Sequence, residues 1–434
     1  MDEKKRFYVS MAILAGMFFI FGFVSWMNSI LIPYFRIACE LTHFQSYFVT
    51  LAFYIAYLVM SVPSGILLKK VGFKSGMMIG FLLMSMGAFI FVPAAYARAF
   101  PIFLVGLFSI GTGLAILQTA ANPYVTIIGP IESATRRISI VGICNKLAGI
   151  LSPLVFAAII LKPTDSELFA AVESGTLDAV TQAAMLDELI RRTIVPYACL
   201  GVLLLLCGIG IKFSVLPEID TEEQNASSDD ASGKKSIFDF PYLILGALAI
   251  FFHVGTQVVA IDTIINYANS FGINLLDAKV FPSYTLACTM LGYIIGIIVI
   301  PKFISQQKVL VLCTVLGLLL SFGVILATGN LSLFGHDAKT SIWFLCALGL
   351  PNSLVYAGIW PLAIRGLGKF TKTGSSLLIM GLCGNAIMPL IYSWCAKYLG
   401  LQGGYWVLVP CYLYLIFFAV KGYKITSWGR SAAK

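Results

Sequence analysis

The sequence predicts an all-α membrane protein with twelve transmembrane helices arranged as two six-helix repeats. Three observations lead to this fold class: of the 434 residues 59% are apolar, only 11% are charged, and the mean hydropathy is +0.92. Soluble domains carry roughly a quarter charged residues. Soluble and disordered chains are therefore excluded, and most of the length is expected to lie in a bilayer.

The spans are stretches of about 20 residues or more without Asp, Glu, Lys or Arg, the helix length that a bilayer core requires. Backbone groups in lipid must bond within the segment, so the stretches are helices, and the alternation typical of a membrane barrel is missing. Two spans each contain one charge, Lys146 and Asp262. The twelve spans are residues 7–35, 41–68, 75–97, 99–131, 138–161, 193–211, 240–276, 280–301, 309–336, 340–364, 373–396 and 398–420.

The distribution of Lys and Arg predicts the orientation in the membrane. Of the 29 basic residues, 20 fall on the side of the N-terminus, 8 fall on the other side, and Lys146 lies within a span. Basic residues gather on the cytoplasmic side of membrane proteins. Both termini are therefore expected in the cytoplasm. The net charge of +9 is explained by this bias, so we expect no nucleic acid partner.

Two polar inserts organise the chain. Residues 217–239, PEIDTEEQNASSDDASGKKSIFD, are rich in Ser, Asp and Glu and are typical of a solvated linker on the cytoplasmic side. They divide the chain into an N-terminal six-helix bundle (1–216) and a C-terminal six-helix bundle (240–434). The second insert, 163–192, is expected to form a short surface helix on the outer side.

The two halves resemble each other weakly. Span four contains Pro123 followed by Gly129, and span ten contains Pro361 followed by Gly366 at the corresponding position. Two six-helix repeats with a ligand site between them are typical of transporters. The pattern therefore predicts a membrane transporter.

The most specific motifs are the loop GILLKKVGFKSG (Gly65 to Gly76) and the span-four segment LQTAANPYVTIIGP (Leu117 to Pro130). The loop resembles the signature loop of the major facilitator superfamily. The segment resembles the hallmark of that superfamily's fucose–galactose–glucose/proton symporter family. WMNSILIPYF, FQSYFVTLAFYIAY and IWPLAIRGLGKFTKTGSSLLIMG are similar to other stretches of its members. The resemblance covers nearly the whole chain and implies a major facilitator fold and a sugar transporter that works by alternating access, usually driven by protons.

Three acids of the family are replaced here. Ser29 stands where the family carries an acid in span one, Gln118 stands where its fucose-transporting members carry one before the TAANP motif, and Gln257 stands where many hexose members carry a Glu. The family's proton chemistry is therefore not carried over residue by residue.

Lys146 and Asp262 are candidates for function because a charge inside a span is costly. In one interpretation Asp262 takes up and releases a proton, since burial favours the neutral carboxyl. In a second, the two residues form an ion pair between the halves. In a third, Lys146 binds the carboxylate of an acidic sugar. The sequence leaves all three open.

Amide side chains and flat rings within the spans are candidate sugar ligands. Gln118 and Asn122 lie four residues apart on one helix face, and Asn145 matches an Asn of the family's fifth span. His253 is a candidate proton relay, although a hydrogen-bonded packing histidine is the favoured explanation. We expect substrate to be bound by Asn28, Gln118, Asn122, Asn145, Lys146, Gln257 and Trp360, and the ion to be coupled through Asp262 and His253.

Trp26, Tyr356 and Asn266 are further candidates for sugar contacts. Asn352 and Asn385 are explained as well by helix packing, because amides also hold membrane helices together.

Enzyme motifs are missing from the sequence. GxSxG, HExxH, the P-loop and GxGxxG have no match in a suitable context, and the ten cysteines form no CxxC pair. We therefore expect no enzyme, no cofactor and no metal. A sugar sensor that does not transport is disfavoured, because no large signalling domain is expected.

The expected function is secondary active import of a monosaccharide (hexose, deoxyhexose or amino sugar) coupled to protons. The alternatives are transport of an acidic sugar bound by Lys146, sodium coupling, or an uncoupled carrier. The expected partners are a small-molecule sugar, a proton or sodium ion, and the lipid bilayer. The chain is expected to be a monomer in the bacterial inner (plasma) membrane.

Overall fold

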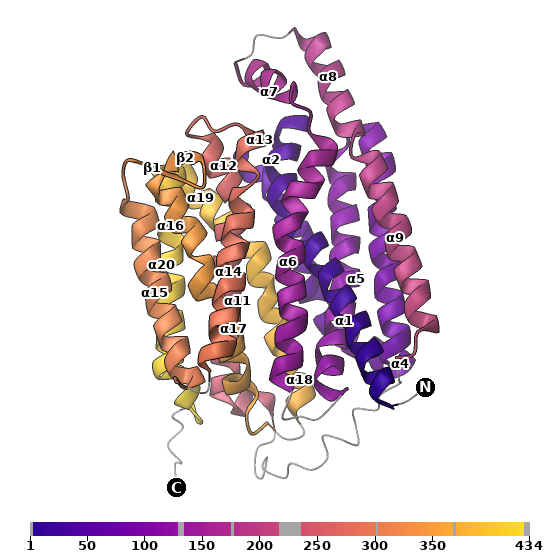
Figure 1. The fold of residues 1–434 in the computed structure, drawn as a ribbon, viewed down its shortest axis with the longest axis vertical. Coiled ribbons are helices and arrows are strands. Elements are labelled where there is room, and N and C mark those ends of the chain that lie inside the picture. Colours follow the sequence, from indigo (N-terminus) through magenta and orange to yellow (C-terminus); the bar gives the residue numbers. More distant parts are fainter. Residues whose placement is uncertain are drawn as a thin grey trace.

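The computed structural model of the protein describes residues 3–128, 134–174, 178–216, 236–300, 303–367 and 370–428. Almost all of these residues are helical, and the helices run side by side along the long axis (Figure 1). The described strands, β1 (Asn330–Leu333) and β2 (His336–Lys339), pair antiparallel as one hairpin. The predicted all-helical membrane fold is confirmed.

The helices before residue 217 pack on one another and form what we call the N-terminal bundle. α4 packs along α5 and α9, and α1 packs along α6. The helices are α1 (Glu3–Trp26), α2 (Asn28–Ala38), α3 (His43–Ser46), α4 (Phe48–Ala97), α5 (Phe100–Ile127), α6 (Ala134–Ile160), α7 (Asp165–Ser174), α8 (Ala179–Arg191) and α9 (Ile194–Phe213).

The helices after residue 235 form the C-terminal bundle. α11 packs along α19 and α17, α14 along α17, and α15 along α20. They are η2 (Ile237–Asp239), α11 (Pro241–Asp262), α12 (Ile264–Asn269), α13 (Leu275–Ala278), α14 (Phe281–Val299), α15 (Gln306–Leu326), α16 (Thr340–Ala347), α17 (Gly349–Ile364), α18 (Thr371–Met380), η4 (Gly381–Cys383), α19 (Gly384–Gly404), η5 (Tyr405–Val407), α20 (Leu408–Val420) and η6 (Gly422–Lys424).

Eleven segments of the described residues are long and apolar enough to cross a membrane. The last of them, Ser376–Lys424, contains both α19 and α20, and its helical geometry is interrupted at Gly400 (φ 76°). α4 is interrupted in the same way at Gly72 (φ 78°) and supplies two crossings. Glycine adopts this left-handed conformation without the steric cost of a side chain. The segments correspond to the twelve predicted spans.

Two spans are interrupted by short breaks. The first is divided at Met27 between α1 and α2, and the seventh is divided at Thr263 between α11 and α12. The Thr263 N–H reaches the Val259 carbonyl oxygen at 3.4 Å, which is a stretched contact. The continuous helix expected over residues 240–276 is therefore wrong. Backbone N–H and C=O groups at helix ends lack intrahelical hydrogen-bond partners. Both breaks therefore place polar backbone groups inside the protein.

The span expected over residues 309–336 is also too long. α15 ends at Leu326, and β1 begins at Asn330. Gly329 and Gly335 have φ values of 86° and 79°, so glycine allows the chain to enter and turn the hairpin. The absence of charged residues does not distinguish the end of the helix from the start of the hairpin, because the exposed first strand is uncharged as well.

The two bundles meet mainly along α6 with α14, α4 with α18 and α19, and α2 with α11 and α12. Ser283 Oγ donates to the Ile150 carbonyl oxygen at 2.6 Å, and Ser61 Oγ donates to the Ser376 carbonyl oxygen at 2.8 Å. Both hydrogen bonds cross from one bundle to the other.

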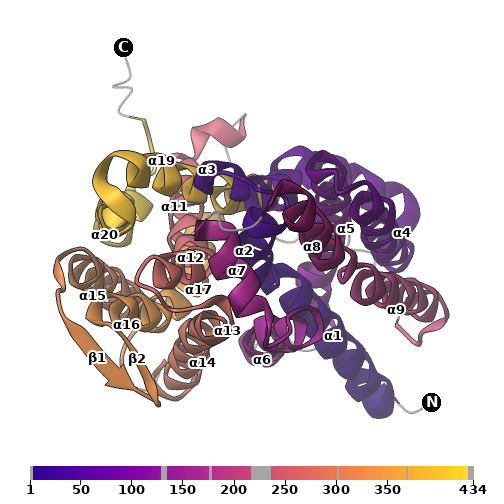
Figure 2. The same cartoon turned by 90° about the horizontal axis from the view of Figure 1, so that it is seen from above.

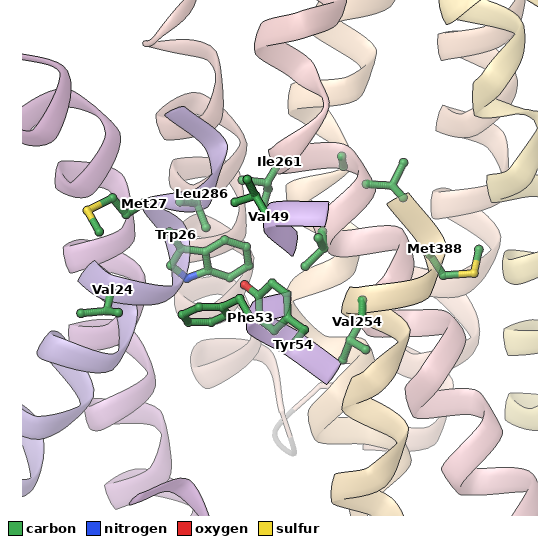
Figure 3. Close-up of a cluster of buried hydrophobic side chains, with 14 of the residues drawn as sticks. Val24, Trp26, Met27, Val49, Phe53, Tyr54, Val254, Ile261, Leu286 and Met388 are labelled. Atoms are coloured by element: carbon green, nitrogen blue, oxygen red, sulfur yellow. The ribbon is translucent and has the colours of Figure 1, made fainter. Parts of the chain in front are cut away.

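Buried apolar side chains fill part of this contact (Figure 3). The cluster includes Met27 at the first helix break and Ile261 beside the second. It contains Val24, Trp26, Met27, Val49, Phe53 and Tyr54 from the N-terminal bundle and Val254, Ile261, Leu286 and Met388 from the C-terminal bundle.

The end of the molecule opposite the start of α1 carries α7, α8 and the hairpin, and we call it the cap end (Figure 1). The insert 163–192 thus contains two helices where the sequence predicts one. α7 lies over α2 when the molecule is seen from this end (Figure 2). Arg192 Nη1 lies 2.7 Å from Asp165 Oδ2, and Arg98 Nη2 lies 2.6 Å from Glu40 Oε2. Ion pairs therefore hold the cap together.

Candidate functional site

Lys146 lies on α6 where this helix contacts α1. Its side chain is buried, and its Nζ lies 4.5 Å from the ring centre of Trp26. Two glycines allow this approach: a Cβ on Gly22 would lie 2.0 Å from the Asn145 carbonyl oxygen, and one on Gly149 would lie 2.4 Å from the Trp26 ring. The ammonium is therefore stabilised by the face of an aromatic ring.

Asn145 precedes Lys146 and is half-buried. Its Nδ2 donates to the Phe18 carbonyl oxygen at 3.1 Å and links α6 to α1. This hydrogen bond does not use Oδ1, so the oxygen is the atom of Asn145 that is available to a ligand.

Gln118 of α5 donates from Nε2 to the Tyr57 hydroxyl of α4 at 2.7 Å. Asn122 lies one turn further along α5 and is half-buried. Tyr57 is close enough to Tyr356 of the C-terminal bundle for the two hydroxyls to interact electrostatically. The pair of Gln118 and Tyr57 therefore faces the contact between the bundles.

The C-terminal bundle contributes aromatic and polar groups to the same region. Tyr356 and Trp360 of α17 are stacked, with ring centres 5.6 Å apart and an interplanar angle of 30°. The His253 ring of α11 lies 6.4 Å from the Tyr356 ring, and His253 is within electrostatic reach of Lys146 across the bundles. Gln257 lies one turn beyond His253 and is half-buried.

Asn28 and Asp262 lie at the two helix breaks. Asp262 is fully buried and Asn28 is 1% exposed. Neither oxygen of Asp262 and neither polar atom of Asn28 has a hydrogen-bond partner. Tyr54 of α4 lies close to both side chains, and its hydroxyl donates to the Ser25 carbonyl oxygen at 3.3 Å. The structure thus brings together two residues that are 234 positions apart in the sequence.

Lys146 and Asp262 do not form an ion pair in this structure. Lys146 contacts the Trp26 ring, and the Asp262 oxygens have no partner. The ion pairs at Arg98, Lys162 and Arg192 all lie at the cap end. The two intramembrane charges therefore belong to separate parts of the site.

Sequence reasoning missed the hydroxyl-bearing side chains at the start of α4 and at Tyr47, the residue before it. Tyr47, Tyr54 and Tyr57 are spaced by seven and three residues, which places them on one helix face, and Thr50 lies on the same face. All four side chains are buried. Repeated hydroxyls at helical spacing within an apolar span are the signal that could have identified them.

Within the described ranges, no three His, Cys, Asp or Glu side chains gather as the ligands of a metal ion would. The ten cysteines are unpaired.

Comparisons with known proteins agree on the fold. The family model of the Major Facilitator Superfamily matches residues 14–376 of this chain. The glucose/galactose transporter of Brucella abortus is 30% identical over 427 residues, covering 98% of this chain and 96% of the relative. The L-fucose-proton symporter of Escherichia coli is 28% identical over 393 residues, covering 89% and 86%.

A solved structure, that of the E. coli fucose:proton symporter, is also similar. It matches with a TM-score of 0.70 at 25% identity and covers 95% of this chain and 98% of that one. The match spans both bundles and the site between them. This chain therefore belongs to the Major Facilitator Superfamily and is a membrane transporter rather than an enzyme.

Proposed function

We propose that the protein imports a monosaccharide across the bacterial inner membrane by alternating access, in symport with a proton. The observation that carries the proposal is the gathering of amide, hydroxyl and aromatic groups from both bundles at their contact, beside a buried carboxylate. Such a site at a repeat interface suits a secondary transporter. The names of the relatives, glucose/galactose transporter and L-fucose-proton symporter, support a sugar as substrate and a proton as coupling ion.

The moving units in this proposal are the bundles 1–216 and 240–434, joined by the linker 217–239. Residues 217–235 of the linker lie outside the described residues. The excess of Lys and Arg on the side of the termini supports a cytoplasmic location for both termini. A single chain contains both bundles, so the proposed transport unit is a monomer.

The proposed sugar ligands come from both bundles. Gln118, Asn122 and Asn145 offer amide groups from the N-terminal bundle, and Gln257 offers one from the C-terminal bundle. Trp360 supplies a flat apolar face on which a pyranose ring can stack. A sugar that contacts both bundles favours their closure around it, because its hydrogen bonds are complete only when the two faces meet.

Asp262 is the proposed proton carrier, and His253 is the proposed proton relay. A carboxylate without water or a partner is costly in its charged form, so closing the bundles around it favours protonation. Tyr54 lies close to both Asp262 and Asn28. A movement at the helix breaks would therefore affect the proposed proton carrier and a proposed sugar ligand together.

Uptake by proteoliposomes containing the purified full chain tests the proposal. A panel of neutral hexoses, deoxyhexoses, amino sugars and sugar acids is offered with an inward proton gradient, with an inward sodium gradient, and with neither. Accumulation of a neutral monosaccharide under the proton gradient is the expected result. Equilibration without accumulation under every gradient would contradict ion coupling.

A second candidate function is transport of an acidic sugar. The observation that favours it is Lys146, a buried ammonium whose described neighbours are the Trp26 ring and His253 but no carboxylate. A substrate carboxylate would supply the missing opposite charge. In the same uptake panel, this function requires that sugar acids are transported and that neutral hexoses do not compete with them.

A further inference from the structure

An unusual number of buried polar atoms lack partners near Asp262. Both Asp262 oxygens, both polar atoms of Asn28 and of Asn266, the Tyr47 hydroxyl and the Thr50 hydroxyl are without a hydrogen bond, and these residues are 0–1% exposed. Buried polar groups in proteins nearly always have partners, because leaving one unsatisfied costs about 1–3 kcal/mol. Five neighbouring exceptions indicate that a ligand completes the site.

The five side chains come from three elements that pack together. α2 carries Asn28, α4 carries Thr50 with Tyr47 directly before its first residue, and the α11–α12 segment carries Asp262 and Asn266. α2 packs against α4, α11 and α12. The Tyr47 hydroxyl lies close to Asn266 and Asp262 without forming a hydrogen bond that meets geometric criteria.

The break after α11 adds backbone oxygens to this set. α11 ends at Asp262, and the carbonyls of a final helical turn are short of intrahelical donors. The end of α1 adds less, because the Ser25 and Trp26 carbonyl oxygens already accept hydrogen bonds from side chains. Helix interruptions of this kind supply carbonyl oxygens to coupling ions in membrane transporters.

The charge of the site favours a monovalent cation. Asp262 is the one acid in it, and no Lys or Arg of the described residues pairs with its oxygens. The titratable groups that face it are Tyr47, directly before α4, and Tyr54 of α4, while Arg36 of α2 reaches Tyr47. One positive charge therefore neutralises the site, whereas a divalent ion would leave a net charge in a medium of low dielectric constant.

A proton does not satisfy all of these atoms. Protonation neutralises Asp262 and adds one donor, but the amide oxygens of Asn28 and Asn266 and the two hydroxyl oxygens still need partners. A hard metal cation takes several oxygen ligands at once, from carboxylate, amide carbonyl and hydroxyl groups. Of the two common monovalent cations, the smaller Na+ requires less rearrangement of these closely packed side chains than K+ does.

We propose that Asp262, Asn28, Asn266, Tyr47 and Thr50 form a sodium-binding site, and that Na+ and a proton compete for it. This inference rests on the proposed role of Asp262 in ion coupling. It adds the identity of the second ion and the oxygen ligands that hold it.

Thermal unfolding of the purified full chain tests binding without transport. NaCl, KCl and choline chloride are compared at equal ionic strength, at neutral and at acid pH. We expect Na+ alone to raise the Tm of the wild-type protein, because a ligand that binds only the folded state stabilises it. The shift should shrink at acid pH, since protons then occupy Asp262.

Three variants locate the site. Asp262→Asn should abolish the sodium-dependent shift in Tm. Thr50→Val, which keeps the side-chain volume, should weaken the apparent Na+ affinity about tenfold or more. Thr112→Val is the matched control, because Thr112 on α5 also has a buried hydroxyl without a partner and should leave the shift unchanged when it is replaced.

The transport arm separates this inference from the proposed function. With equal pH inside and outside, an inward Na+ gradient should drive sugar accumulation by the wild type. The inference is overturned if Na+ acts no differently from K+ and choline in both assays while a pH gradient still drives uptake. Failure of both gradients would overturn the proposed ion coupling as well. If Asp262→Asn does not fold, Thr50→Val against Thr112→Val decides the outcome.

Discussion

The charges at the cap end and the charges inside the spans are held in opposite ways. At the cap, Arg192 and Asp165 form an ion pair at 2.7 Å, and its two side chains are 17% and 3% exposed. Inside the spans, Lys146 contacts an aromatic ring, and the Asp262 carboxylate has no hydrogen-bond partner. The Arg192–Asp165 pair is largely buried too, so what separates it from the intramembrane charges is the pairing.

This difference separates structural from functional charges. A paired charge stabilises the fold that holds it, whereas an unpaired buried charge lowers the free energy of unfolding and is useful only if a ligand neutralises it. Removing one cap partner should therefore harm stability more than transport. Removing an intramembrane charge should harm transport more than stability.

The largest expected effect is that of Asp262→Asn. We expect gradient-driven accumulation of sugar to fall to the level of passive equilibration, because the amide cannot carry a coupling charge. Counterflow in proteoliposomes should persist, and in sodium-free buffer the Tm should stay equal or rise since an unpaired charge has been removed. Unchanged accumulation in this variant would remove Asp262 from the coupling mechanism.

The second effect concerns Lys146→Gln and the acidic-sugar candidate. If Lys146 binds a substrate carboxylate, the apparent affinity for a hexuronate should fall about tenfold or more, since hydrogen bonds to charged groups contribute about 1.5–3 kcal/mol. Competition assays with neutral hexoses measure binding to the same site by sugars that lack the carboxylate. The matched control is Lys162→Gln, because Lys162 is an exposed cap lysine paired with Glu188. Equal losses for acidic and neutral sugars would exclude a charge-selective role.

A smaller effect is expected from Gly22→Ala, which alters the support of Lys146. The added Cβ would meet the Asn145 carbonyl oxygen at 2.0 Å and push α1 away from α6. Overpacking of this kind costs about 1–3 kcal/mol, so the Tm should fall. Gly16→Ala on the same helix has nothing within 4 Å of its Cβ and should leave the Tm nearly unchanged. A similar drop for both variants would mean that helix propensity, rather than the contact with α6, matters.

The smallest effect on transport is expected from Arg192→Gln. Loss of the guanidinium leaves the buried Asp165 carboxylate without its ion pair, so α7 should become more sensitive to protease while uptake is largely retained. Limited proteolysis and uptake measured on the same preparation check both parts. A loss of coupling equal to that of Asp262→Asn would mean that the cap charges also serve transport.

Much of the site could be predicted because intramembrane polarity is costly. Lys146 and Asp262 are conspicuous in the sequence, and Gln118, Asn145 and Trp360 follow from motif and spacing. The site proposed for Asp262, Tyr47, Thr50 and Asn28 could not be predicted, because these residues come from separate segments whose contact depends on how the bundles dock. Hydroxyls are also common in membrane helices, so their types alone carry little information.

The sequence by itself determined the class of fold, the number of spans and the two intramembrane charges, because each follows from the transfer of local stretches of chain into lipid. The tertiary structure alone decided that Lys146 and Asp262 stay apart, and that α1 and α11 end where their polar neighbours meet. It also decided that the span beginning at residue 309 gives way to a hairpin. These outcomes depend on contacts between distant segments. Close packing selects such contacts, and hydropathy along the chain does not record them.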